Sequence, residues 1–203
     1  MEDQEIFRQG ISINSTSRNE IVFALKFFLQ NFASKLFHIM PDLKHVYLLL
    51  GGNSGNVFQT LSLARSYIDN HVGNVVRHSN LYESEPWGMQ STELFINQAL
   101  EITTDLPPLR LLHELLAIEV AFGRVREGSV PTSRTLDIDI LLYSELVIQT
   151  HNLTIPHPRL HLRRFALMPL AELAPGIIHP IFGKSIAELL KECQDMLHVA
   201  ILN

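Results

Sequence analysis

Two aspartates two positions apart, Asp137 and Asp139, are the residues of this chain whose spacing points most directly to chemistry. They stand in an otherwise apolar run, residues 136–143, that is typical of a β-strand. Alternate side chains of a strand share a face, so the two carboxylates lie together and repel each other. A divalent cation would neutralise them, and Mg²⁺ held by carboxylates and substrate phosphates is usual at phosphoryl-transfer sites. An incidental ion pair on a solvated strand is the alternative.

Three arginines border the segment before this strand. Arg124 and Arg126 precede residues 127–133, which contain Gly, Ser and Pro and have no core-forming pattern, and Arg134 follows them. Fixed arginines around an irregular loop suit a lid that closes over phosphates. Glu119, on the last turn of the preceding helix, opposes the helix dipole. It therefore needs a partner, either an arginine or a nucleotide hydroxyl.

A second polar surface is expected on a strand at residues 95–102. Strand alternation places Phe95 and Asn97 on one face, with Ala99 and Glu101, and the apolar Ile96, Leu100 and Ile102 on the other. An aromatic ring and an amide two residues apart can stack on, and hydrogen-bond to, a flat heterocycle. Ordinary packing with a surface amide is the alternative.

The elements that must position these residues follow from periodicity and turn signals. Residues 46–50 are typical of a buried strand, and a glycine-containing turn then leads through Asn56, a candidate N-cap, into a helix with apolar residues at 57, 61, 64 and 68. The turn lacks the Gly-Lys-Ser/Thr ending of a P-loop. The remaining expected elements are a strand region at 75–82, a helix from Pro107-Pro108 to Gly123, a rigid extended piece at 154–159, a helix at 163–173 and a terminal helix at 185–197.

Composition limits the class of protein. With 203 residues, of which 46% are hydrophobic, the chain fits one domain with additions. The net charge of -5 argues against a general nucleic-acid or membrane-surface role. A single cysteine excludes an internal disulfide framework and favours the cytoplasm, and the ten histidines show no metal-ligand spacing. We expect a cytoplasmic monomer with no nucleic-acid or membrane partner.

Residues 1–42 differ from the rest of the chain. A polar start is followed by a Phe-rich stretch at 21–40 that lysines and amides interrupt, so neither a membrane span nor a targeting signal fits. We expect a peripheral, helical N-terminal extension at 1–42 and a main domain at 43–203, with Met40 able to serve as an alternative start.

Taken together, spaced motifs across about residues 44–182 resemble the 6-hydroxymethyl-7,8-dihydropterin pyrophosphokinase family of folate biosynthesis. The motifs are YLLLGGNSGN, SNLYESEPWG, FINQAL, IEVAFGRVR, RTLDIDILLY, IPHPRLHLRRF and PLAELAP. The resemblance implies an α+β ferredoxin-like sandwich, with a four-stranded antiparallel core sheet and helices on one face. It also implies a diphosphokinase that transfers the pyrophosphoryl group of ATP to 6-hydroxymethyl-7,8-dihydropterin with two Mg²⁺ ions.

The resemblance also assigns residues to roles. Asp137 and Asp139 would hold the metal, and Arg124 and Arg134 would stabilise charge on the transferred group. The implied ATP contacts are Glu119, Arg124, Arg126, Arg134, Ile140, Thr154, His157 and Arg163. The implied pterin contacts are Ser84, Trp87, Phe95, Asn97 and Phe165.

Three positions depart from the family pattern: Gly52 replaces a serine, Glu127 a basic residue and Ser133 a proline. They bear on the lid and on nucleotide affinity more than on the reaction.

Two other readings stay open. One is a different metal-dependent phosphoryl or nucleotidyl transferase, which would need a basic template surface. The other is a non-catalytic nucleotide-binding module.

Overall fold

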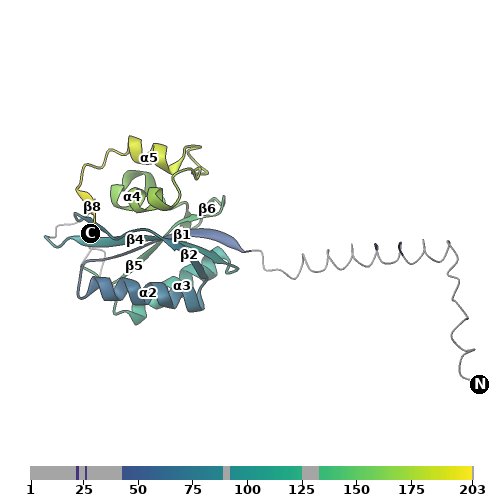
Figure 1. The fold of residues 1–203 in the computed structure, drawn as a ribbon, viewed down its shortest axis with the longest axis horizontal. Coiled ribbons are helices and arrows are strands. Elements are labelled where there is room, and N and C mark those ends of the chain that lie inside the picture. The colour runs from purple at the N-terminus through teal and green to yellow at the C-terminus, as the bar shows by residue number, and fades with distance from the viewer. Residues whose placement is uncertain (1–21, 23–25, 27–42, 89–91, 125–132, 203) are drawn as a thin grey trace, which may run out of the picture. The chain divides into compact units, whose positions relative to one another are not determined.

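In the computed structural model, six antiparallel strands among the described residues form one sheet (Figure 1). The structure describes residues 43–88, 92–124 and 133–202, together with Val22 and Lys26. The chain divides after Asp42 into two units, and all that follows concerns the second, residues 43–203. The expected helical extension at 1–42 lies outside the described residues, apart from Val22 and Lys26, which are helical.

The elements alternate between strands and helices along the chain. The first half contains β1 Lys44–Gly52, α2 Val57–His71, β2 Asn74–His78, β3 Tyr82–Ser84, β4 Phe95–Thr104 and α3 Pro108–Ala121. The second half contains β5 Asp137–Tyr143, β6 Ile148–Gln149, β7 Thr154–Ile155, the 3₁₀ helix η1 Leu160–Leu162, α4 Arg164–Leu173, α5 Ile186–Glu192 and β8 Val199–Ile201. The order across the sheet is β5-β1-β4-β3-β8, and β2 also pairs with β4. The short strands β6 and β7 form a separate pair.

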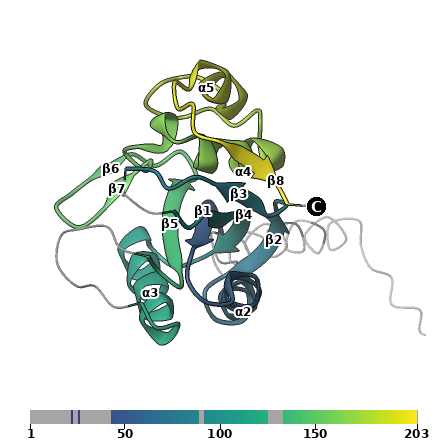
Figure 2. The same cartoon turned by 90° about the vertical axis from the view of Figure 1, so that its left-hand side faces the viewer.

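Helices cover both faces of the sheet, so the expectation of helices on one face was wrong. In Figures 1 and 2, α2 and α3 lie on one side and α4 and α5 on the other. One core cluster joins α2 and α3 to alternate residues of the strands, including Leu48, Leu100 and Ile138. A second cluster joins α4 and α5 to the intervening residues, including Leu49 and Ala99. Each central strand alternates apolar residues toward both layers, which a single helical layer would leave exposed.

The caps of α2 and α3 agree with the sequence. The Asn56 side chain accepts a hydrogen bond from the Gln59 amide at 3.2 Å and so caps α2. Pro108 occupies the first turn of α3, where its missing N–H is not needed. Gly123, with φ of 84°, follows α3 in the left-handed conformation that a glycine adopts without strain.

The C-terminal elements differ from expectation. Helix α5 ends at Glu192, not near Leu197, because Cys193 has an extended backbone (φ -62°, ψ 123°). The chain then forms β8, which pairs with β3. A three-residue strand has too short a pattern to be predicted from sequence. The expected extended piece at 154–159 is extended only in β7 and turns after the cis Ile155–Pro156 bond.

The expected strand region at 75–82 is two strands, β2 and β3, which pair with different halves of β4. In the described part of the chain the sheet thus has six strands, two more than the four expected for its core. Within the described part of the chain, no helix is both long and apolar enough to cross a membrane.

Candidate active site

Strand register places the two predicted polar surfaces on one face of the sheet. Asp137 of β5 lies opposite Gly51 of β1, and Gly51 lies opposite Asn97 of β4. Directly opposed residues of antiparallel strands share a face, so the Asp137 carboxylate and the Asn97 amide point the same way, about 10 Å apart. Gly51 leaves the space between them open, because a Cβ there would lie 2.8 Å from Asn97 Oδ1.

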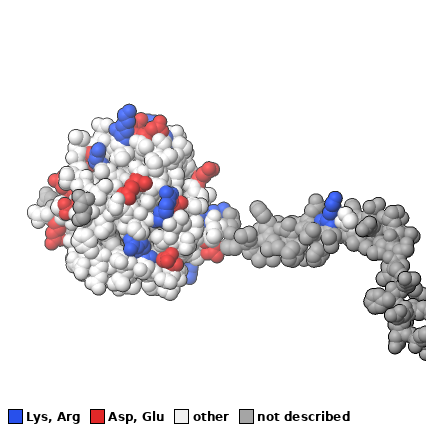
Figure 3. All heavy atoms as spheres, viewed as in Figure 1, with Lys and Arg blue, Asp and Glu red and all other residues white. Residues whose placement is uncertain are grey.

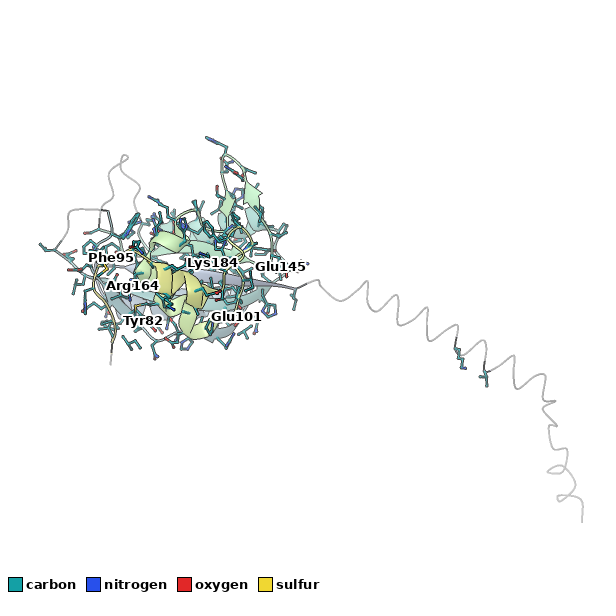
Figure 4. All side chains as sticks on the ribbon, turned by 90° about the horizontal axis from the view of Figure 1, so that it is seen from above. Tyr82, Phe95, Glu101, Glu145, Arg164 and Lys184 are labelled. Carbon is teal, nitrogen blue, oxygen red and sulfur yellow. The ribbon has the colours of Figure 1, made fainter. Side chains whose placement is uncertain are left out.

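This face is the one that α4 and α5 cover farther along the strands. Asp139 lies in the next row, opposite Leu49, which packs in the α4 and α5 core cluster. Figure 4 shows Phe95, at the start of β4, and Arg164, at the start of α4, toward the same end of the sheet, with Glu145 at the other. The site therefore forms where the helical layer ends and the strand face is left to polar side chains.

Two arginines hold the Asp137 carboxylate. Arg124 Nη1 donates to Asp137 Oδ1 at 2.5 Å, and Arg134 Nη1 donates to Oδ2 at 2.6 Å. Arg124 also pairs with Glu119, which is buried and accepts a hydrogen bond from the Ile138 amide at 2.8 Å. Glu119 thus has the arginine partner that its place at the end of α3 called for, and it ties that helix to β5 between the two aspartates.

The Asp139 carboxylate has weaker partners. Arg163 Nη1 lies 3.3 Å from Asp139 Oδ2, and His157 Nε2 lies 3.8 Å from the same oxygen. Burial, together with the negative charge of Asp137, raises the pKa of Asp139 to about 6. Burial, together with the positive charges of Arg163 and Arg159, lowers the pKa of His157 to about 4. His157 is therefore neutral at pH 7, and Asp139 carries a charge that its surroundings stabilise poorly.

Two arginines of this site each have a buried nitrogen atom without a hydrogen-bond partner. Arg134 Nε and Arg163 Nε are buried and have no hydrogen-bond partner. Buried donors of this kind usually find an acceptor. Two of them beside a carboxylate pair suit an anionic ligand with several oxygen atoms, such as a polyphosphate.

Aromatic rings flank these arginines. The Arg134 guanidinium lies 5.7 Å from the centroid of the Phe95 ring. The Arg163 guanidinium lies 4.9 Å from the centroid of the Trp87 ring and 5.5 Å from that of the Phe165 ring. The structure thus places Phe95 beside one arginine and Trp87 with Phe165 beside another, in cation–π geometry.

The Asn97 side chain, which the sequence predicts to hydrogen-bond a flat heterocycle, is held by a residue of the neighbouring strand. Asn97 is 3% exposed, and its Nδ2 donates to Ser84 Oγ at 2.9 Å. That bond joins β4 to β3, which leads into the loop that carries Trp87. Four of the five predicted pterin contacts, Ser84, Trp87, Phe95 and Asn97, therefore come from these two strands and their connecting loop.

The remaining predicted residues are placed less closely. The Ile140 side chain packs in the core with α2 and α3, on the face opposite Asp139. Thr154 lies in β7, and the His157 amide just beyond it donates to Leu141 O of β5 at 2.9 Å. Arg126 and Glu127 lie outside the described residues.

Two residues of the site were not assigned a role from sequence. The Arg159 guanidinium lies 5.6 Å from the centroid of the Trp87 ring. Asn53 makes hydrogen bonds to Ser133 and Arg134. The sequence signal for both was present in the IPHPR and GGNSG motifs, but their partners lie 72 and 81 positions away and could not be inferred.

The carboxylate pair fits Mg²⁺ bound jointly with a substrate. Among residues 43–88, 92–124 and 133–202, no group of three or more His, Cys, Asp or Glu side chains could hold a metal ion. Two carboxylates on one face supply hard oxygen ligands, and burial together with the negative charge of Asp137 raises the pKa of Asp139. Phosphate oxygens would have to complete the coordination.

The fold is α+β, and its carboxylate pair with nearby arginines is of the kind used in phosphoryl transfer. The family model for 7,8-dihydro-6-hydroxymethylpterin-pyrophosphokinase (HPPK) matches residues 47–175. The chain belongs to this family, whose reaction is pyrophosphoryl transfer in folate biosynthesis.

Relatives agree with this assignment. The chain is 40% identical over 138 residues to a 2-amino-4-hydroxy-6-hydroxymethyldihydropteridine pyrophosphokinase of Porphyromonas gingivalis, covering 66% of this chain and 93% of the relative. It is 39% identical over 150 residues to the Haemophilus influenzae enzyme of that name, covering 73% and 92%. The Plasmodium falciparum HPPK-DHPS structure with pteroate has a TM-score of 0.64 at 16% identity. That match covers 74% of this chain and 44% of the Plasmodium chain, and it shows the fold alone.

Proposed function

We propose that this chain transfers the β,γ-pyrophosphoryl group of ATP to 6-hydroxymethyl-7,8-dihydropterin through the site built on Asp137 and Asp139. The hydroxymethyl oxygen bonds to the β-phosphorus and loses its proton. The bond from that phosphorus to the α,β-bridging oxygen breaks, and AMP leaves. The observation that carries this proposal is the shared strand face, which has a carboxylate pair framed by arginines on one side and an amide with an aromatic ring on the other.

The direct test is AMP release. Purified protein with ATP, Mg²⁺ and 6-hydroxymethyl-7,8-dihydropterin should form AMP and the pterin diphosphate in equal amounts. No AMP should form without the pterin. Nucleotide binding with no turnover would favour a non-catalytic nucleotide-binding module instead.

The arginines supply charge stabilisation at fixed positions. Arg124 and Arg134 are held against Asp137, so their guanidinium groups are already oriented before a ligand binds. The partnerless Nε atoms of Arg134 and Arg163 support contacts with ATP phosphates. We propose Glu119, Arg126, Thr154 and His157 as further ATP contacts. The Ile140 side chain is in the core, so Ile140 would contact ATP only through its main-chain atoms.

Asp137 and Asp139 would hold Mg²⁺, which we propose binds as two ions together with ATP. When bound, the metal offsets negative charge on the phosphates and on the carboxylate pair. The rise in the pKa of Asp139, caused by burial and by the charge of Asp137, supports a role for this carboxylate in holding a cation.

Phe95 and Phe165 are proposed to sandwich the pterin, with Asn97 reading its hydrogen-bonding edge. Trp87 and Ser84 would complete the pocket. The proximity of Phe95 to Arg134 supports a pterin placed next to the transferred group.

The order β5-β1-β4-β2 supports a ferredoxin-like core. The lone buried Cys193 supports a reducing compartment such as the cytoplasm, and we propose a monomer.

The charge distribution disfavours a template-dependent nucleotidyl transferase. Acidic and basic side chains are interspersed on the face drawn in Figure 3, without a broad basic area. A polymerase-like substrate would need such an area. A small-molecule acceptor needs only the local arginines.

Replacing Asn97 by alanine should weaken pterin binding much more than ATP binding. The variant removes the amide that would pair with the heterocycle and leaves Ser84 without its partner. The expected loss in pterin affinity is about 1–3 kcal/mol, measured by isothermal titration in the presence of a non-hydrolysable ATP analogue and Mg²⁺. Asn70→Ala, at an exposed position of α2, is the matched control. An equal loss for both ligands would contradict the assigned role.

Deleting residues 1–39 should leave kcat and KM largely unchanged. Every described residue of the proposed site lies between Gly51 and Phe165, and β1 begins at Lys44. The truncated and full chains should be compared for AMP release and for Tm. A folded truncation that lacks activity would refute this prediction.

A further inference from the structure

We infer that Asn53, Ser133 and Glu93 form a hydrogen-bond relay that positions Arg134 for the reaction. This inference rests on the proposed role of Arg134 and adds three positioning residues to it. None of the three was assigned a role by the family resemblance. Two of them border segments outside the described residues, at 89–91 and 125–132.

Asn53 holds the main chain of Arg134 from two sides. The Arg134 amide donates to Asn53 Oδ1 at 2.8 Å, and the Asn53 amide donates to Arg134 O at 3.0 Å. Asn53 is 7% exposed, so these bonds are shielded from water. The loop after β1 therefore fixes the backbone from which the Arg134 side chain extends toward Asp137.

The loop can approach this closely because residue 52 is glycine. A Cβ on Gly52 would lie 2.5 Å from Thr135 O, a clash with main-chain atoms. On its other side, Thr135 Oγ1 donates to Phe122 O at the end of α3 with a distance of 2.8 Å. Arg134 thus lies in a backbone clamped between the loop after β1 and the end of α3. The replacement of serine by Gly52 is consistent with this close approach.

From Asn53 the relay continues in one direction. Because Asn53 Oδ1 accepts from Arg134, its Nδ2 faces Ser133 Oγ, at 3.2 Å, as a donor. Ser133 Oγ in turn donates to Glu93 Oε2, also at 3.2 Å. Every donor meets an acceptor, and the relay reaches a carboxylate, the strongest acceptor available.

The relay connects the two halves of the site. Glu93 stands two residues before Phe95, on the segment that leads into β4. Arg134 stands three residues before Asp137 and contacts both Asp137 and Phe95. A proline in place of Ser133 has no hydroxyl, so the link to Glu93 depends on this chain's own serine. The relay would hold Arg134 at a fixed position relative to the proposed pterin site.

Three variants separate the relay from a general structural role. Asn53→Asp keeps the acceptor for the Arg134 amide but loses the donor to Ser133, Ser133→Ala removes the hydroxyl, and Glu93→Gln weakens the final acceptor. Each should lower kcat about 3- to 10-fold, with a smaller change in KM for ATP. The double variant Ser133→Ala/Glu93→Gln should be no slower than the worse single variant, because both break the same link. Ser66→Ala, an exposed serine of α2, should leave kcat unchanged.

Losses that multiply in the double variant, or that appear in KM and not in kcat, would overturn the relay. The wild-type assay comes first: no AMP release would count against the proposed function, not against the relay. The same double-variant cycle measured as free energy of unfolding tests the hydrogen bonds without any need for activity. Additive effects there would show that Ser133 and Glu93 are not coupled.

Discussion

Replacing Asp139 by asparagine is expected to lower kcat on the order of 10²- to 10³-fold and, at the same time, to raise the Tm of the ligand-free protein. Activity falls because asparagine keeps the shape of the side chain but brings no negative charge to Mg²⁺. Stability rises because burial and Asp137 make the charged form of Asp139 costly in the folded state. Activity and stability should therefore move in opposite directions.

The sign of the pKa shift sets the pH at which this gain appears. The folded pKa of about 6 lies above the reference value of 3.8, so the folded protein binds this proton more tightly than the unfolded chain does. The stabilising effect of the proton is complete below the unfolded pKa and is lost as the pH rises through the folded one. The Tm advantage of Asp139→Asn should be absent near pH 4 and reach about 2–8 °C above about pH 6.5, for a gain of about 1–2 kcal/mol.

Asp137→Asn is the matched comparison. It should lose activity to a similar degree, but its Tm should fall, because Arg124 and Arg134 each lose a carboxylate partner at 2.5 and 2.6 Å. Thermal unfolding from pH 4 to 8 checks both variants. A rise in Tm for both would mean that the arginine pairs contribute little, and full activity with Mg²⁺ would move the metal site elsewhere.

Replacing Arg134 by alanine is expected to lower kcat on the order of 10²- to 10³-fold while changing KM for either substrate much less. Its guanidinium is held by Asp137 and lies beside Phe95, and its buried Nε has no hydrogen-bond partner. A donor left open in this way can gain an acceptor when charge develops on the transferring group. The loss should therefore fall mainly on the transition state.

Steady-state kinetics with both substrates varied measures this separation. Arg134→Lys keeps the charge but not the planar fork and should recover only part of kcat. Arg110→Ala, an exposed α3 residue paired with Glu114, controls for loss of positive charge. KM or Kd rising as much as kcat falls would assign Arg134 to ground-state binding.

The sequence alone determined which side chains share a strand face. The two-residue period placed Asp137 with Asp139 and Phe95 with Asn97, and the structure confirms both pairs. It also determined the caps of α2 and α3 and the family. These features depend on neighbours a few residues away, where strand alternation and turn chemistry act directly.

How these surfaces meet and how their charges are balanced depends on the tertiary structure. From the strand pattern, removing either aspartate would relieve the same repulsion. The fold instead gives Asp137 two close arginines and leaves Asp139 with more distant partners. The Asp137–Gly51–Asn97 row depends on pairing among strands that are 40 or more positions apart, and the second helical layer on where α4 packs. Strand pairing, helix packing and the partners of each aspartate are set by packing and desolvation over the whole sheet, which local periodicity does not encode.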